Sequence, residues 1–326
     1  MGFFYIYSIY TINEEMTMIK GLAITPPILG RISIGKIVEK NGKRLPEKDD
    51  QFTITSQIQS KEGWVKHPLD EQLRAQAPNQ KLRTIPVRMI FNDPDLNLRA
   101  EYTLFERQTG RPVCVGNGET CQRLTNQGVE QHPCPSPDLC PMAQGGNCKP
   151  YGRLHVNLDE SDELGSFIFR TTGFNSIRTL AARLSYYHAA SNGLLSCLPL
   201  QLTLRGKSTT QSYRTPVYYV DLTLREGTSL HDGIQIAKEI DQQSRQGGFN
   251  QSALDQIARQ GYGNARFEVN SEEGVDLVEE FYVKEIPDVE HSQPDLKTKA
   301  KPKFHQKEDF VQDIQKDLQQ HVRAVN

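Results

Sequence analysis

The sequence predicts an α+β protein built on a mixed or antiparallel sheet. Short runs rich in β-branched and aromatic residues alternate with Gly, Pro and Asn turns through residues 19–227. Apolar residues then recur at helical spacing in 229–246 and 250–260. Five of the six cysteines lie between Cys114 and Cys148. We therefore expect one core domain with a Cys-rich zinc-binding loop, followed by C-terminal helices.

Composition narrows the class of protein. The 326 residues carry 38 Lys plus Arg against 40 Asp plus Glu, a formal net charge of −2. No overall positive field therefore draws the chain to nucleic acid or to an anionic membrane. The mean hydropathy is −0.58, and no apolar run reaches the roughly 18 residues that span a bilayer. We expect a soluble, cytoplasmic protein.

The aromatic N-terminal stretch 2–10 is not read as a secretion signal. No basic residues precede it, and the acidic Asn13-Glu-Glu15 follows it where a small-residue cleavage site would lie. We expect residues 1–18 to be an over-extended start or a disordered segment, and the alternative is an extra N-terminal strand.

The core domain 19–227 is predicted from turns and periodicity. Asn41-Gly42 between extended runs indicates a hairpin. His67-Pro68 opens a short helix over 67–77, and residues 112–151, rich in Gly, Pro and Asn, are predicted to be a loop. A second helix with an apolar stripe is predicted over 176–187. The strands are predicted at 51–55, 82–91, 98–105, 152–158, 166–171, 198–204 and 215–224.

Three further segments follow the core domain. Residues 228–285 are predicted to form a helical or α+β extension, and residues 286–305, with several prolines and lysines, a flexible basic linker. Residues 306–326 are predicted to form an amphipathic tail helix, which would dock on a partner or on its own domain. Its apolar stripe recurs every four residues, at Phe310, Ile314, Leu318 and Val322.

The cysteine cluster predicts a metal. Zinc in structural sites takes four tetrahedral ligands and is satisfied by thiolates. Prolines and glycines around the cysteines let distant thiolates converge. The predicted ligands are Cys134, Cys140 and Cys148, with the fourth drawn from Cys114 or Cys121, and His132 as an outside choice.

Other interpretations of the same residues stay open. An iron–sulfur cluster also uses four thiolates, and unligated cysteines would behave as small apolar residues. A catalytic zinc would keep an open position, for which Glu119 could supply the acid or base. Cys197 is predicted to lie in the core, and His155, in an alternating strand, to be a surface histidine.

No motif points clearly to an enzyme: the sequence has no phosphate-binding Gly loop, nucleophile elbow or paired zinc histidines. A local basic patch could still contact DNA phosphates. Its members would be the arginines of the segment Phe174 to Arg183 together with Arg205, Lys207 and Arg214. The competing interpretation is a solvated helix face.

Five motifs follow one another along the chain: Gly30-Arg-Ile, Gln51-Phe-Thr-Ile-Thr-Ser56, Gly116-Asn-Gly-Glu119, Cys134-Pro135 and Cys148-Lys-Pro-Tyr-Gly-Arg-Leu154. In this order they resemble one known family. The chain is similar to the recombination directionality factors of phages that use serine integrases, and to mobile-element relatives described as hydrolases or metal-binding proteins. The resemblance spans about residues 19–225 and carries over only the zinc candidates.

The resemblance implies a non-enzymatic accessory protein. Such a factor binds an integrase that already sits on attachment-site DNA and biases it from integration towards excision, so its contact with DNA is indirect. Two alternatives remain: a metal-dependent hydrolase or nuclease that uses the cysteine segment, and a single-stranded DNA-binding accessory of the element's replication or recombination.

Overall fold

The computed structural model describes residues 26–40, 43–60, 63–158, 165–208 and 216–262, with Phe267, Val278, Phe281 and Tyr282. The strands in chain order are β1 (Ile28–Lys40), β2 (Lys43–Ser60), β3 (Gly63–Lys66), β4 (Thr84–Met89), β5 (Leu98–Phe105), β6 (Pro112–Gly116), β7 (Thr120–Thr125), β8 (Gly128–Pro133), β9 (Cys148–Asn157), β10 (Ser166–Thr171), β11 (Leu200–Lys207) and β12 (Val217–Leu224). The helices are α1 (Pro68–Gln76), α2 (Pro94–Asn97), α3 (Phe174–Ala190), α4 (Leu230–Gln246) and α5 (Gln251–Tyr262), with short 3-10 turns at Pro78–Gln80, Pro141–Gly146 and Leu195–Cys197.

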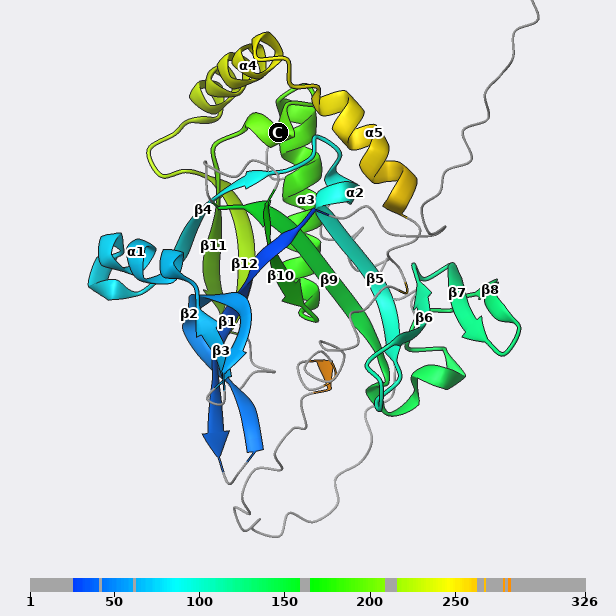
Figure 1. The fold of residues 1–326 in the computed structure, drawn as a ribbon. Helices are drawn as coiled ribbons and strands as arrows, with labels where there is room; N and C mark the ends of the chain where they lie inside the picture. The colour runs from blue at the N-terminus through cyan, green and yellow to red at the C-terminus, as the bar shows by residue number, and fades with distance from the viewer. Residues whose placement is uncertain are drawn as a thin grey trace, which may run out of the picture. The chain divides into compact units, whose positions relative to one another are not determined.

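In the described part of the chain, twelve strands join in one branched sheet (Figure 1). The main path runs β3-β2-β1-β10-β9-β5-β6-β7-β8, and β4 links β9 to a branch of β11 and β12. β1 and β10 pair in parallel, whereas the neighbouring pairs β1–β2 and β9–β10 are antiparallel. The predicted α+β class, with a mixed sheet and several helices, is confirmed.

The first hairpin has the predicted position. β1 and β2 pair antiparallel with Lys40 opposite Lys43, on either side of the predicted Asn41-Gly42 turn, which lies outside the described residues. β2 begins at Lys43, well before the predicted strand 51–55, because its ladder with β1 continues from the turn. Pairing with a neighbour therefore extends the strand through a charged stretch of weak β propensity.

The prediction that residues 112–151 form a loop is wrong. Three short strands, β6, β7 and β8, extend the sheet beyond β5, and Cys148 is the first residue of β9. Gly118 and Gly128 have φ values of 98° and 121°, a backbone that favours glycine, in the two turns that connect these strands. The strands are short and weakly apolar, so their alternation did not reveal them.

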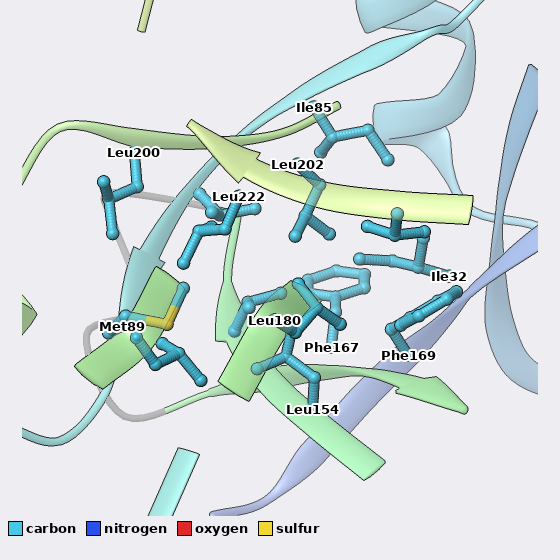
Figure 2. Close-up of a cluster of buried hydrophobic side chains, with 14 of the residues drawn as sticks. Ile32, Ile85, Met89, Leu154, Phe167, Phe169, Leu180, Leu200, Leu202 and Leu222 are labelled. Atoms are coloured by element: carbon cyan, nitrogen blue, oxygen red, sulfur yellow. The ribbon is translucent and has the colours of Figure 1, made fainter. Parts of the chain in front are cut away.

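The core lies between the sheet and α3 (Figure 2). Successive strand residues point to opposite faces, so Phe167 and Phe169 of β10 face the core together with Leu154 of β9. From α3, Leu180 and Leu184 pack against them. Ala181, an apolar residue of the predicted helix 176–187, is instead exposed. Burial of this apolar face stabilises the fold by roughly 25 cal/mol for each Å² removed from water.

The two C-terminal helices pack in different places: α4 on the main core, and α5 on α2 and the segment before it. α4 contributes Ala237 to the main core, and α5 buries Ala258 in a smaller cluster with Ile90, Phe91 and Leu96. Cys197 is buried, as predicted. The described helices include none that is long and apolar enough to cross a membrane.

The described residues belong to one compact unit. The predicted linker 286–305, the tail helix 306–326 and the N-terminal segment 1–18 lie outside the described residues.

Candidate functional site

The five cysteines predicted as metal ligands lie on or beside β6, β7, β8 and the start of β9. Cys114 lies on β6 and Cys148 at the start of β9, and both pair with Leu104 of β5, one from each side. Cys121 lies on β7, where its register partner on β8 is His132. The remaining two follow β8: Cys134 comes directly after its last residue, and Cys140 directly precedes the 3-10 turn Pro141–Gly146.

A glycine makes room for two of these cysteines. A Cβ atom on Gly116 would lie 2.7 Å from Cys121 Cβ and 2.9 Å from Cys134 Sγ, closer than side chains tolerate. The backbone N–H of Cys134 donates to the carbonyl oxygen of Glu119 at 2.8 Å, which ties the Cys134 segment to the β6–β7 turn. The absence of a side chain at Gly116 therefore lets Cys121 and Cys134 approach each other.

The thiols share one poorly solvated environment. Burial, and then the hydrogen-bonded thiol of Cys121, raise the pKa of Cys114 to about 11, although the Arg123 guanidinium opposes this. Burial also raises the pKa of Cys148 to about 12, with further contributions from the four neighbouring thiols of Cys114, Cys134, Cys140 and Cys121. The four other cysteines therefore lie close enough to Cys148 to disfavour a thiolate there, and each of the five is a free thiol.

The described residues are not arranged as a complete metal site. Among them, no group of three or more His, Cys, Asp or Glu side chains converges closely enough to hold an ion. His132, the outside choice, has its Nε2 atom 3.2 Å from Glu130 Oε2. The side chain of Glu119 is exposed at a turn, while its carbonyl holds Cys134. The thiols would have to close in on an ion to complete four ligands.

An aromatic cluster missed by the sequence analysis packs beside the start of β9. The rings of Phe105, Tyr151 and Phe281 meet edge to face, with centroids 4.7 to 5.8 Å apart. The Tyr282 hydroxyl donates to the carbonyl oxygen of Asn147 at 2.7 Å, and Lys149 Nζ donates to that of Phe281 at 3.2 Å. Residues far along the chain thus brace the strand that carries Cys148.

The sheet face that points away from the core carries a row of arginines. Arg99 of β5 lies opposite Arg153 of β9, which lies opposite Arg170 of β10. Glu101 accepts a hydrogen bond from Arg153 Nη2 at 3.0 Å and lies 3.8 Å from Arg99 Nη2.

His155 also lies on this face, and its predicted surface position is wrong, because it is buried. Burial, followed by the charges of Arg153, Arg170 and Arg99, lowers its pKa to about 3. Strand alternation predicted the face of the sheet on which His155 lies but not what covers that face.

Part of the predicted basic patch comes together beside α3. Arg183 and Arg205 both bond to Asp221, and Lys207 bonds to Asn175 at the start of the helix. Arg214 lies outside the described residues.

Comparison with known families identifies the chain. Residues 29–225, from β1 to the end of β12, match the Gp3-like family, described as recombination directionality factor-like. This protein belongs to that family. The match confirms the resemblance seen in the sequence and includes all five clustered cysteines, whereas α4 and α5 of this recombination directionality factor-like protein follow it. No curated protein and no solved structure matches the chain.

Proposed function

We propose that this protein is a recombination directionality factor, which binds a serine integrase on attachment-site DNA and shifts it from integration towards excision. The family match over residues 29–225 carries the proposal. In this role the protein works in the cytoplasm of a bacterial host and acts through protein contacts on the integrase, without chemistry of its own. The formal net charge of −2 agrees with a protein that does not rely on an overall field for DNA.

The cysteines would hold a structural Zn²⁺ ion. The ligands would be Cys134, Cys140 and Cys148, with Cys114 or Cys121 as the fourth. Zinc ions bind thiolates, so an ion would offset the cost of ionising thiols in this partly buried cluster. Bound there, zinc would tie the segment after β8 to the strands β6 and β9, which strengthens an extension that the main core does not reach.

Zinc binding predicts a defined metal content. The protein purified under reducing conditions should contain one zinc ion per chain, and Cys148→Ser should lose it because the tetrahedral set is incomplete. Metal analysis by mass spectrometry measures the content, and visible absorbance distinguishes colourless zinc from a brown iron–sulfur cluster.

Cys197→Ala is the matched control, because Cys197 is a buried cysteine outside the cluster. It should retain the metal. Cys114→Ser and Cys121→Ser, compared side by side, identify the fourth ligand as the one whose loss removes zinc. A wild-type protein without zinc or iron, or full zinc retention in Cys148→Ser, contradicts the zinc site.

The proposed role predicts a switch in the direction of recombination. With the serine integrase encoded by the same mobile element, the purified protein should drive excision between the two junction sites and inhibit integration. An in vitro assay on plasmid substrates, read by gel electrophoresis, measures both reactions. The same substrates incubated without integrase should stay uncut, whereas cleavage by this protein alone would support the nuclease alternative. Excision that proceeds equally with and without the protein would rule out the proposed role.

A further inference from the structure

Two arginines of the surface formed by α3, β11 and β12 share one buried carboxylate. Arg183 Nε of α3 donates to Asp221 Oδ1 at 2.9 Å, and Arg205 Nε of β11 donates to Asp221 Oδ2 at 2.6 Å. The Asp221 side chain is buried, whereas Arg183 and Arg205 are 43% and 47% exposed. One anion therefore holds two cations in place while part of each guanidinium stays in contact with water.

Two more cations extend this surface along α3. Lys207 Nζ, at the end of β11, donates to Asn175 Oδ1 in the first turn of α3 at 2.8 Å. Arg178 is exposed on the same helix. The sequences of α3, β11 and β12 contain a single acidic residue, Asp221. These three elements therefore carry four Arg or Lys side chains and one carboxylate, although acidic residues outnumber Arg and Lys in the chain as a whole.

Arg178 lies on an exposed stripe of α3 that also carries two aromatic rings. Phe174, Arg178, Ala182 and Tyr186 follow at four-residue intervals and are all exposed, so they form one outward stripe of α3. Phe174 is 56% and Tyr186 54% exposed. The outward side of α3 is thus exposed along the length of the helix, so a large ligand can lie along it.

We propose that this surface, formed by Arg178, Arg183, Arg205 and Lys207, binds the phosphate backbone of duplex DNA without sequence preference. Guanidinium groups match phosphate oxygens in a two-pronged geometry, and the bonds to Asp221 fix two of them before the ligand arrives. Such contacts position a protein on DNA and carry no base information. This inference goes beyond the proposed function, since contact with an integrase does not require it.

The test measures binding of a fluorescently labelled short DNA duplex of arbitrary sequence by anisotropy, across a salt series. The affinity should fall with salt, with a log–log slope of about 0.9 for each phosphate contacted. Arg178→Glu and Lys207→Glu should each weaken binding roughly tenfold and reduce the slope by about one. Arg183 and Arg205 are left intact, because their loss would strand the buried Asp221.

Lys238→Glu is the matched control. Lys238 is exposed on α4, whose Gly233 packs against Leu224, at the end of the β11–β12 pair opposite Lys207. This variant should bind the duplex as the wild type does, and circular dichroism should show that all three variants fold. The proposal is overturned if the wild type does not bind the duplex at low salt, if only single-stranded DNA binds, or if Lys238→Glu weakens binding as much as Arg178→Glu. Binding of the integrase by Arg178→Glu is measured separately, in the absence of DNA. If the variant still binds the integrase, its weaker binding of DNA leaves the proposed function unaffected.

Discussion

Phe167→Ala should lower the free energy of unfolding by about 3–5 kcal/mol. Phe167 is the second residue of β10 and is buried between the sheet and α3 (Figure 2). Its ring packs edge to face on His67, with centroids 5.0 Å apart, and lies against the backbone of Gly30, where a Cβ would approach it to 2.7 Å. Truncation would leave a cavity, because the surrounding strands and α3 are held by their own packing and cannot move in to fill it. Urea unfolding monitored by circular dichroism measures the change.

Phe174→Ala is the control for this prediction. It removes the same ring from the exposed side of α3, so the free energy of unfolding should change by no more than about 0.5 kcal/mol. Equal destabilisation by the two substitutions would show that Phe167 does not occupy the centre of the core.

His155 should make the protein less stable in mild acid. Because burial and then the nearby arginines hold its pKa near 3 in the folded protein, the histidine protonates near pH 6.5 only in the unfolded chain. A lowered histidine pKa means that the stability is complete above about pH 6.5 and falls as the pH drops towards 3, by about 1.4 kcal/mol for each pH unit. Burial of a neutral imidazole beside Arg153, Arg170 and Arg99 is the cause.

His155→Gln removes this titration. Between about pH 7 and pH 5 the wild type should lose about 2 kcal/mol more stability than the variant. Comparing the two proteins cancels the titration of other groups, including any release of metal by acid. His231→Gln, at an exposed position of α4, is the matched control and should keep the wild-type pH dependence. The same pH dependence in wild type and His155→Gln would show that the imidazole titrates normally.

Most elements could be predicted because their signals are local. The strand predicted at 166–171 is β10, and the helix predicted over 176–187 lies within α3. α1 begins after His67, whose Nδ1 accepts a hydrogen bond from the backbone N–H of Leu69. Turn residues, caps and the spacing of apolar positions depend on neighbours within a few residues, so sequence alone reveals them.

The candidate site was only partly predictable. The five cysteines crowd into one short stretch, which is visible in the sequence and predicts that they act together. Their placement depends on β5, since Leu104 pairs with Cys114 on one side and with Cys148 on the other. Strand register of this kind follows from long-range pairing, and the Pro-Gly composition of the segment suggested a loop instead.

By itself the sequence determined the α+β class, the order of most elements, the grouping of the cysteines and the family to which the chain belongs. Only the tertiary structure decided that β1 pairs in parallel with β10, that His155 is buried among arginines and that Asp221 holds Arg183 and Arg205 together. The reason is physical. Periodicity reports which face a side chain occupies within its own element, whereas burial and charge pairing depend on which distant segment comes to lie on that face.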